Sequence, residues 1–435
     1  MSMKYSIQLF GLIGLIVISS CNYGPKRSKT IPVIDIEANV DNMQKIYLSQ
    51  FSDKILYIPM ESKVDHLLMW NTHLYADFSE NYIIDSDGQI CLLYDKNGHF
   101  IKQIGSQGRG PGEYTGIKYV KLLGNKILVY DYISDDLIEY RIDGSFEKRY
   151  RSGLTGNNKY RLMKCFFLDD SLILGNIENF TGRDEFKAMI INKSGSIKKF
   201  YKNYIYFTLE PGMPYAQSPG EASYYRFRDK VFFKEYLNDT LFQLDANYNM
   251  TPYIIFRFGK HKMPLSDRGK PWSKIDFGSY ISLGKIFETN NYLFLVCGSK
   301  KYFPVKRLTP EIIRLPGLDD YIQWYNSGGV IGVYDKNSKK LVFSAPSITD
   351  NHLSGTGLYN DIDGGPKFQL HGMLNDSTMV MKIRFDYLVE YIESDEFNKN
   401  MPKYPDKKRK LHELVNSLQM SGFDNPVYMF VTFKK

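Results

Sequence analysis

The sequence predicts an all-β protein, a six-bladed β-propeller of four-stranded antiparallel blades, and three observations carry this prediction. Apolar residues alternate with polar residues along most of the chain, with a period of two rather than 3.6. Clusters of glycine, asparagine and aspartate separate these short runs and favour tight turns. The combined pattern of strands and turns then recurs at about the length of one propeller blade.

Four consecutive segments share the repeated pattern, and they begin at residues 82, 127, 172 and 231. The spacing is 45 residues from 82 to 127, 45 from 127 to 172, and 59 from 172 to 231. The second strand of each segment ends in YDKNG, YRIDG, INKSG or LDANY, and a third strand follows. Asn-Gly and Asp-Gly pairs favour hairpin turns, because those turns need positive φ angles. Each segment is expected to form one blade.

The C-terminal part of the chain is expected to supply two further blades and a helix. A fifth blade is expected from YLFLVCG and GGVIGVYDKNSKKLVFS, which are separated by an insertion, residues 299–327, with a short helix of its own. A sixth is expected in FQLHGMLNDSTMVMKIRFD. Leu411, Leu414, Val415 and Leu418 then follow the spacing of one apolar helix face. This spacing predicts a short helix before the final strand.

Closure of the ring is expected to use both ends of the chain. A ring of blades leaves unpaired strand edges unless it is closed. Ile55–Met60 near the start and Val427–Phe433 at the end both have the pattern of a strand. We expect them to share one blade. The competing interpretation is an open sandwich with a helical subdomain, and the internal repeat favours the ring.

The N-terminus resembles the signal sequence of bacterial lipoproteins. An apolar run from Ile7 to Ile18 is too short for a membrane span, which needs about 20 apolar residues, and fits a secretory signal. Ser19 and Ser20 precede Cys21, as small residues do in the lipobox of that class. In those proteins the signal is removed before the cysteine, which then carries the lipid. Alternatives are an uncleaved anchor or an ordinary signal with a chance cysteine.

This resemblance divides the chain into a signal peptide (1–20), a lipidated Cys21 with a flexible tether (21–30), and a single propeller domain (31–435). The tether sequence NYGPKRSKT is polar and contains a Gly-Pro pair, which suits a flexible connection. Surface-exported lipoproteins often carry an acidic cluster after the cysteine, and none follows here. We therefore expect an outer-membrane lipoprotein of the cell envelope that faces the periplasm.

Composition argues against nucleic acid as a partner. The formal net charge is +8, and the dense basic run PDKKRKLHE suits a solvated helix start better than a broad basic face. The 34 Tyr and 28 Phe suit strands and cores. Cys91, Cys165 and Cys297 lie in apolar runs and are expected to be buried thiols, with one disulfide left open as an alternative. A monomer is expected.

Five motifs, taken in order, resemble the six-bladed β-propeller lipoproteins of Bacteroidales-type bacteria. They are LSQFSDKILYIPMES, IGSQGRGPGEYTGI, YLNDTLFQLD, YNDIDGGPKF and DNPVYMF, and together they cover nearly the whole chain after the signal. The wider relatives are NHL-type propellers. The resemblance implies six blades around a central channel and no established chemistry. Long third and fifth blades and the basic start of the C-terminal helix depart from the family pattern.

No catalytic motif is recognised in the sequence. The nucleophile motif G-x-S-x-G is absent. The glycine-rich stretch GSQGRGPG lacks the lysine and hydroxyl of a phosphate-binding loop. No two histidines stand in H-E-x-x-H or a similar compact pair. The histidines, each expected to be a surface or turn residue, are His66, His73, His99, His261, His352, His371 and His412.

Asn360, Asp361 and Asp363 are the candidate metal ligands. Their oxygens suit Ca²⁺ or another divalent ion, and the following glycine pair permits unusual backbone. Neither this cluster nor DSDG at Asp85 has the full calcium-loop spacing with a distal glutamate. Asp and Asn before Gly are also ordinary turn residues, so a purely structural role is the alternative.

The stretch IGSQGRGPGEY is expected to connect the first blade to the second. Such a connection crosses one face of a propeller near the channel mouth, and loops on rigid scaffolds often carry function. Arg109, Glu113 and Tyr114 are its candidate binding residues. The arginine can pair with a carboxylate or phosphate, and the tyrosine can stack on a sugar. The alternative is that Arg109 pairs with Glu113 or a neighbouring blade and fixes the crossing.

The sequence favours an exported, lipid-anchored binding or scaffold module, and no catalytic residue is assigned. The expected partners are the membrane, through the lipid anchor, and a glycan, a peptide or another envelope protein. The alternative is a metal-dependent hydrolase or lyase with a divalent ion at the channel mouth. A weaker third interpretation is an assembly factor in outer-membrane transport.

Overall fold

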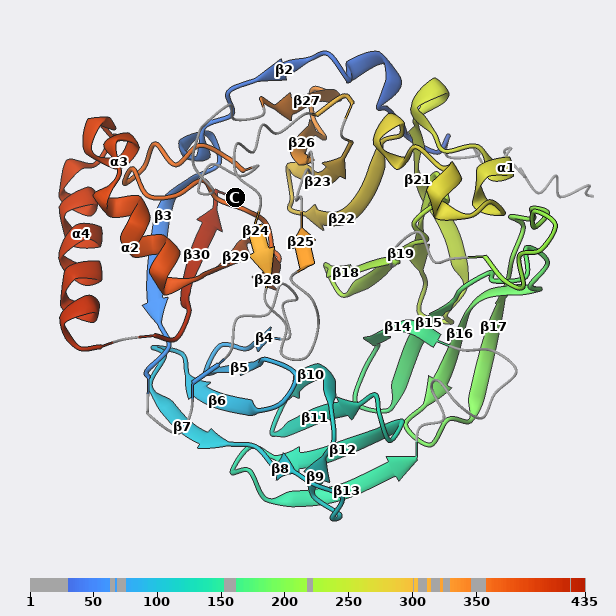
Figure 1. Ribbon diagram of the computed structural model, residues 1–435, viewed down its shortest axis with the longest axis horizontal. Coiled ribbons are helices and arrows are strands. Elements are labelled where there is room, and N and C mark those ends of the chain that lie inside the picture. Colours follow the sequence, from blue (N-terminus) through green and yellow to red (C-terminus); the bar gives the residue numbers. More distant parts are fainter. Residues whose placement is uncertain are drawn as a thin grey trace, which may run out of the picture. The chain divides into compact units, whose positions relative to one another are not determined.

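Figure 1 shows the computed structural model of the protein. The structure describes residues 30–62, 67–68, 76–151, 162–216, 222–299, 301–303, 311–313, 321–323, 329–345, 357–422 and 424–434. Pro32–Lys435 forms one compact unit by itself. The predicted signal peptide, Cys21 and nearly all of the tether lie outside the described residues.

Six antiparallel sheets form the blades of a ring within this unit (Figure 1). In the first three blades, consecutive strands pair with one another in chain order. Blade 1 holds β4 (Asp77–Phe78), β5 (Tyr82–Ser86), β6 (Cys91–Asp95) and β7 (Phe100–Gln103). Blade 2 holds β10 (Ile117–Leu123), β11 (Lys126–Asp131), β12 (Asp136–Arg141) and β13 (Phe146–Arg151). Blade 3 holds β14 (Leu162–Phe167), β15 (Leu172–Ile177), β16 (Phe186–Asn192) and β17 (Ile197–Lys202).

Each of the last three blades includes a strand from the N-terminal part of the chain. Blade 4 holds β18 (Ser223–Phe227), β19 (Lys230–Lys234), β20 (Thr240–Leu244) and β21 (Met250–Arg257), with β1 (Val33–Asp35) parallel to β21. Blade 5 holds β22 (Ser282–Glu288), β23 (Tyr292–Gly298), β26 (Gly329–Asp335) and β27 (Lys340–Ser344), with β2 (Met43–Gln44) parallel to β27. Blade 6 holds β28 (Gly372–Asn375), β29 (Thr378–Ile383), β30 (Val427–Phe433) and β3 (Ser52–Pro59).

Short elements connect the blades. Two small sheets are formed by β8 (Ser106–Gln107) with β9 (Glu113–Tyr114), and by β24 (Glu311–Ile313) with β25 (Tyr321–Gln323). The 3₁₀ helices are η1 (Glu37–Asn39), η2 (Leu48–Gln50), η3 (Gly259–His261), η4 (Trp272–Lys274) and η5 (Phe277–Ser279). The α-helices are α1 (Leu265–Arg268), α2 (Phe385–Glu393), α3 (Asp395–Lys399) and α4 (Pro405–Met420).

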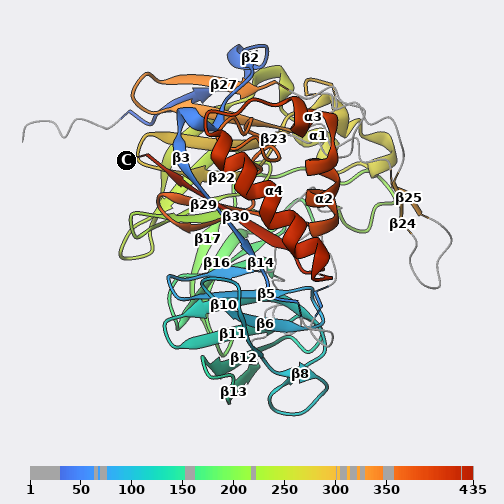
Figure 2. The same ribbon diagram turned by 90° about the vertical axis from the view of Figure 1, so that its left-hand side faces the viewer.

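The predicted six-bladed propeller, closed by both chain ends, is confirmed. In blade 6, β3 pairs antiparallel with β30 from Ser52↔Phe433 to Pro59↔Val427. The predicted C-terminal helix is α4, which buries Leu411 and Val415. Two more helices, α2 and α3, precede it between β29 and β30, and Figure 2 shows all three beside β3. In the insertion, residues 299–327, the described residues 311–313 and 321–323 pair as β24 and β25, and the short helix expected elsewhere in it lies outside the described residues.

The hydrophobic core lies between neighbouring blades. Ile84 and Leu93 of blade 1 pack with Val120 and Ile138 of blade 2, and all four side chains are buried. Similar clusters join the other blades. A propeller blade therefore gains most of its apolar burial from its neighbours, and each fully buried aliphatic side chain contributes about 1.5–3 kcal/mol. Among the described residues, no helix is long and apolar enough to cross a membrane.

A buried ion pair joins the last blade to the first. The Lys382 ammonium of β29 lies 2.8 and 2.9 Å from the two carboxylate oxygens of Asp85 on β5. The Tyr428 hydroxyl donates a hydrogen bond of 2.7 Å to the same carboxylate. Both charged side chains are at least 96% buried, so each depends on the other for its polar contacts. Asp85, weighed above as a turn residue or calcium ligand, is thus part of the ring closure.

Replacing one member of this pair should destabilise the whole fold. Asp85→Asn leaves the buried Lys382 charge without its carboxylate, and should lower the free energy of unfolding by about 3–5 kcal/mol. Urea unfolding followed by circular dichroism measures this change. The matched control is Asp395→Asn in the exposed Asp395–Lys399 pair, where a change below about 1 kcal/mol is expected. If Asp85→Asn lowers the free energy of unfolding by no more than this control does, closure does not depend on the buried pair.

Candidate functional site

A cavity of about 920 Å³ lies at the centre of the ring. Residues of β4, β10, β14, β18, β22 and β28, one strand from each blade, line it. We call this cavity the channel. A volume of this size is at the upper end of the range for ligand pockets, and strands hold most of the described residues of its wall.

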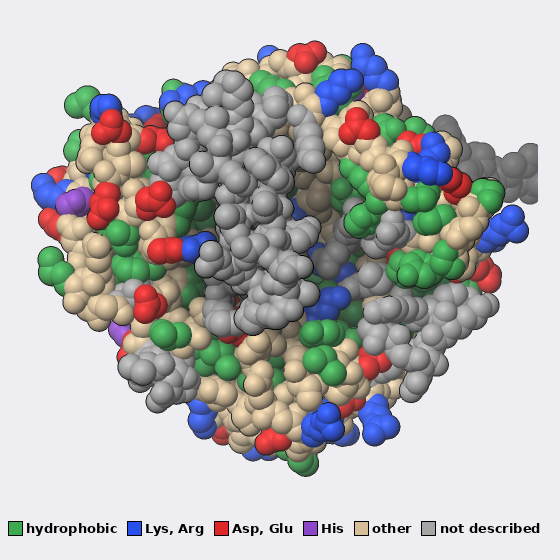
Figure 3. Space-filling model, viewed as in Figure 1, with side chains coloured by type: hydrophobic (Ala, Val, Ile, Leu, Met, Phe, Trp, Pro, Cys, Tyr) green, Lys and Arg blue, Asp and Glu red, His purple; other side chains and the backbone are tan. Residues whose placement is uncertain are grey.

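Basic side chains dominate the charge of the channel wall. Lys118, Lys121, Lys164, Arg226 and Lys285 contribute positive charges from four different blades. Figure 3 shows Lys or Arg side chains in the hollow at the centre of the ring. The described lining residues include only two carboxylates, from β4 and from the end of β28. Five cations against two anions leave these residues with a net charge of +3.

Both carboxylates of the wall already have protein partners. Asp77 binds the Lys121 ammonium at 2.8 Å, and its second oxygen accepts the backbone N–H of Leu122. Asp376 accepts the backbone N–H of Arg228 at 3.0 Å. These contacts hold neighbouring parts of the ring together at the channel wall. Asp77 offsets the charge of Lys121, and the Asp376 carboxylate is engaged by a backbone donor.

Aromatic rings stand between the basic residues. Phe166 of β14 and Tyr224 of β18 are stacked, with ring centroids 5.8 Å apart and an interplanar angle of 11°. Tyr119 of β10 stacks on Tyr130 at 6.0 Å. Phe166, Tyr224 and Tyr119 all line the cavity. The wall therefore offers flat apolar faces as well as positive charge.

His371 is neutral in the channel wall. Its Nδ1 accepts the backbone N–H of Lys382 at 3.0 Å, and its Nε2 lies 3.3 Å from the Gln369 side-chain oxygen. The proton of the ring is therefore on Nε2. Burial, together with the positive charges of Lys285 and Lys382, lowers the pKa of His371 to about 3. This histidine adds no positive charge to the channel at neutral pH.

The described wall contains no nucleophile activated by a histidine. Ser223 is the hydroxyl residue of the wall, and no hydrogen bond joins it to His371 in the part of the chain that the structure describes. The Nδ1 atom of His371 is already occupied by a backbone donor. The geometry therefore suits the binding of anions and flat rings better than acyl transfer, which needs a nucleophile–base contact.

The glycine-rich loop lies at the outer edge of blade 2, beside β13 (Figure 1). The Arg149 guanidinium of β13 donates hydrogen bonds to the carbonyls of Gly110, at 3.1 Å, and of Glu113. The sequence placed this loop near the channel mouth, and that expected position was wrong. The loop follows the outer strand of blade 2 because Arg149 binds its backbone.

The three candidate residues of this loop have different surroundings. Arg109 is exposed, and no ion pair joins it to Glu113, although both residues are described. The Glu113 carboxylate accepts the backbone N–H of Gly110 at 2.7 Å and so shapes the loop. Tyr114 is fully buried between blades 1 and 2. Of the three, only Arg109 is presented to solvent, and ligand binding by this loop stays a prediction.

The candidate metal residues are divided between two sets of protein partners. The Asp361 carboxylate accepts the backbone N–H and the hydroxyl of Ser49, at 3.0 and 2.6 Å. Asp363 is buried. Its Oδ1 accepts hydrogen bonds from the Asn360 side-chain amide, at 2.6 Å, and from the Gly365 backbone N–H, at 2.9 Å. The structure thus brings the side chains of Asn360 and Asp363 together, whereas the Asp361 carboxylate binds Ser49 instead. Burial raises the pKa of Asp363 to about 6.

Other predicted sites have simpler outcomes. Within the described ranges, no group of three or more His, Cys, Asp or Glu side chains is arranged to hold a metal ion. No disulfide joins the described residues Cys91, Cys165 and Cys297 to one another. Three of the seven histidines lie outside the described residues, namely His66, His73 and His352. Divalent-ion binding stays a prediction.

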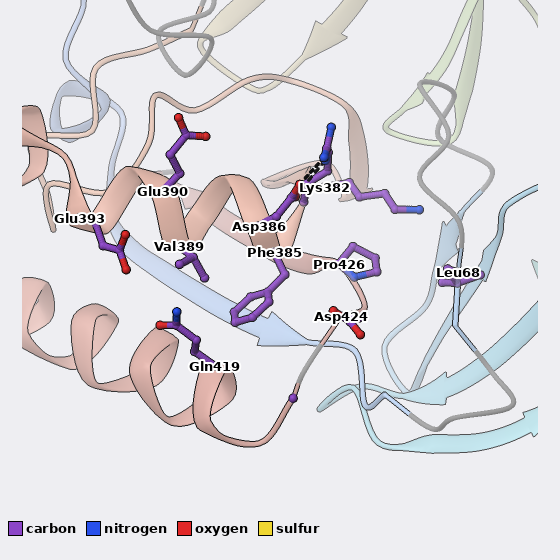
Figure 4. A pocket seen from close by; sticks show the side chains of 12 residues that line it. Leu68, Lys382, Phe385, Asp386, Val389, Glu390, Glu393, Gln419, Asp424 and Pro426 are labelled. Carbon is purple, nitrogen blue, oxygen red and sulfur yellow. Dashed lines mark hydrogen bonds and ion pairs between the residues drawn. The ribbon is translucent and has the colours of Figure 1, made fainter. Parts of the chain in front are cut away.

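A second cavity, of about 680 Å³, lies between α2, α4 and the segment before β30 (Figure 4). Phe385 and Val389 of α2 form part of its apolar surface, and Glu390 and Glu393 stand on the same helix. The residues that line this cavity carry a net negative charge, whereas those of the channel carry a net positive charge. The lining of this second cavity comes from blade 6, the helices of that blade, and Leu68 between β3 and β4, so it lacks the convergence of six strands.

Comparison with known proteins identifies the family. Residues 31–432 match the model of a family described as a domain of unknown function, DUF4934. The chain belongs to this family. A search of curated protein sequences found no match.

Solved structures similar to this DUF4934 chain share its fold. One is a Bacteroides fragilis protein described as a candidate exported protein, with a TM-score of 0.59 and 18% sequence identity. The match covers 93% of this chain and 100% of that protein's chain. Another is a member of the DUF4221 family from Bacteroides vulgatus, with a TM-score of 0.50 and 12% sequence identity. The match covers 88% of this chain and 97% of that protein's chain. Both are too distant in sequence to indicate a shared function. The propeller that the sequence resemblance implied is confirmed, whereas lipidation and NHL kinship stay predictions.

The stability of the Asp363 site should depend on pH. The folded-state pKa of Asp363 is about 6, above its ordinary value of 3.8. The protonated carboxyl therefore favours folding at low pH, and this contribution is lost as pH rises through 6. Asp363→Asn removes the group that titrates. The free energy of unfolding of this variant, relative to that of the wild type, should therefore rise by about 2 kcal/mol between pH 4 and pH 8.

Urea unfolding at pH 4, 6 and 8 measures this difference. Parallel pH profiles of the wild type and Asp363→Asn would contradict the assignment of a buried, protonated carboxyl. Excess Ca²⁺ at pH 8 tests the metal prediction in the same experiment. Stabilisation of the wild type by Ca²⁺, abolished in Asp363→Asn, would support a divalent ion at this cluster.

Proposed function

We propose that the protein is an exported, lipid-anchored binding module that takes its ligand in the central channel. The observation that carries this proposal is the channel wall, where cations and aromatic faces from five of the six innermost strands converge on a cavity of about 920 Å³. Pockets that combine apolar surface with a few placed polar groups are the usual form of a ligand site. A ring of blades also keeps this wall preorganised, which limits the entropy that binding costs.

The lipid anchor is proposed from the sequence. The apolar run before Ser19, Ser20 and Cys21 resembles a lipoprotein signal, and a tether to residue 30 would connect the lipid to the propeller. Several acyl chains at one cysteine would hold the protein firmly, since each buried methylene contributes about 0.8 kcal/mol. Location in the outer membrane, facing the periplasm, is part of the same proposal, as is kinship with NHL-type propellers.

Binding is favoured over catalysis by the chemistry of the described wall. Its lysines are suited to hold anions, and its histidine is neutral and engaged on Nδ1. A glycan, a peptide or an envelope protein would each use such a surface without chemical change. The protein is proposed to act as a monomer and without nucleic acid, because its net charge of +8 is modest and its densest basic run suits a solvated helix start.

The aromatic wall should contribute directly to affinity. Tyr224→Ala removes one ring of the Phe166–Tyr224 stack, and should weaken ligand binding about tenfold, because a lost aromatic contact costs about 1 kcal/mol or more. Calorimetric titration with dextran, polygalacturonate and poly-glutamate supplies the probes. The matched control is Tyr204→Ala, whose ring is 75% exposed outside the channel.

The control variant should bind like the wild type, and thermal unfolding should confirm that both variants are folded. Equal losses in Tyr224→Ala and Tyr204→Ala would contradict a site in the channel. Turnover of any bound probe by the purified protein would contradict a purely binding role.

A further inference from the structure

Three of the innermost strands share the same irregularity at the same place. A β-bulge lies between Ile117 and Tyr119 in β10, between Leu162 and Lys164 in β14, and between Leu283 and Lys285 in β22. The residue before each bulge is buried, with Ile117, Leu162 and Leu283 at most 3% exposed. A bulge inserts one extra residue and re-aims the side chains that follow it.

The bulges deliver basic residues to the channel. Lys164 and Lys285 occupy equivalent positions, directly after the bulge in blades 3 and 5, and both line the cavity. In blade 2 the equivalent position is Tyr119, and Lys118 within the bulge lines the cavity beside it. A one-residue shift moves a side chain to the opposite face of a strand. The positive wall is therefore built into the backbone of three separate blades.

These lysines surround the channel rather than line one side of it. Lys118, Lys164 and Lys285 come from blades 2, 3 and 5, and Lys121 and Arg226 stand further along their strands. One compact anion cannot contact cations on several walls and at several levels together. A ligand with several negative groups spaced along its length can do so. Positive charge in a narrow cavity with low-dielectric walls also focuses the field on such a ligand.

The aromatic rings of the channel wall set a second requirement for the ligand, which is a flat apolar face. Phe166 follows Lys164 two residues later on β14, and Tyr224 stacks on it from β18. The ligand must therefore combine repeated negative charge with flat apolar faces. Sugar rings carry such faces in their C–H bonds, and an acidic oligosaccharide repeats a carboxylate or sulfate along the chain. An acidic peptide has the charges but no rigid ring beside each one.

We infer that the channel recognises an acidic oligosaccharide, held by Lys118, Lys164 and Lys285 through its carboxylate or sulfate groups and by the neighbouring aromatic rings. This inference rests on the proposed function, because it names the ligand class of the same channel. It predicts that affinity depends on both the charge of the ligand and the salt concentration, since salt screens such contacts.

The test removes the three lysines and measures binding of defined probes. The triple variant Lys118→Gln/Lys164→Gln/Lys285→Gln is titrated with oligomers of polygalacturonate (carboxylate), heparin (sulfate), dextran (neutral) and poly-glutamate (acidic peptide). The matched control, Lys96→Gln/Lys198→Gln/Lys410→Gln, removes three exposed lysines outside the channel wall. Net charge is then equal in the two variants, and only the position of the lost charge differs.

The expected result is binding of polygalacturonate or heparin that weakens at least tenfold in the channel variant and less than twofold in the control. Tighter binding of polygalacturonate would identify the carboxylate as the recognised group, and tighter binding of heparin, which carries both carboxylate and sulfate groups, would show that sulfate contributes. Equal affinity for dextran and the acidic probes, unchanged in the channel variant, would overturn the inference and leave the proposed function standing. Tighter binding of poly-glutamate would overturn the oligosaccharide class. Failure of every probe to bind would overturn the proposed function as well.

Discussion

The pairing of β3 with β30 is the constraint on which the rest of the structure depends. A propeller blade buries its apolar faces only against its neighbours, so an open ring would expose two of them. Here the first long strand of the chain becomes the last strand of blade 6. The buried Lys382–Asp85 pair then joins blade 6 to blade 1. The channel exists because these contacts bring all six innermost strands around one axis.

Closure and recognition are coupled in the same blade. Lys382 binds Asp85 through its side chain, and its backbone N–H holds Nδ1 of His371 in the channel wall. The ammonium of Lys382 also helps keep that histidine neutral. The ring junction thus fixes one part of the wall, and the bulges before Lys164 and Lys285 fix others. A rigid, positive wall follows from contacts whose first role is structural.

The fold was predictable from the sequence because its signals are local. Period-two alternation, Asp-Gly and Asn-Gly turns and two terminal strands each lie in short stretches. The repeat was recognised from the second strand of each blade, β5, β11, β15 and β19. The innermost strands β4, β14, β18 and β22 lie outside the predicted segments, and β4 is only two residues long. Helix α2 was missed as well, although Phe385, Leu388 and Ile392 follow the spacing of one helix face.

The candidate site was less predictable, for a physical reason. Lys164 and Lys285 are ordinary surface lysines in sequence, and only the bulges show that they are equivalent and face the channel. The Lys382–Asp85 pair spans 297 residues, beyond the reach of any local pattern. Conversely, the conspicuous loop around Arg109 follows the outer strand β13. Glycine content marked where the backbone bends, whereas the position of charge depended on tertiary packing.

Hydrogen exchange of the β3 amides tests the central claim most directly. If pairing of β3 with β30 holds the ring closed, the amides of Leu56, Ile58 and Met60, which point toward β30, should exchange only through global unfolding. Their opening free energy should then equal that of the β29 and β30 amides. Exchange of β3 at a much lower opening free energy, while the other strands of blade 6 stay protected, would show that the ring holds together without it and would contradict the account.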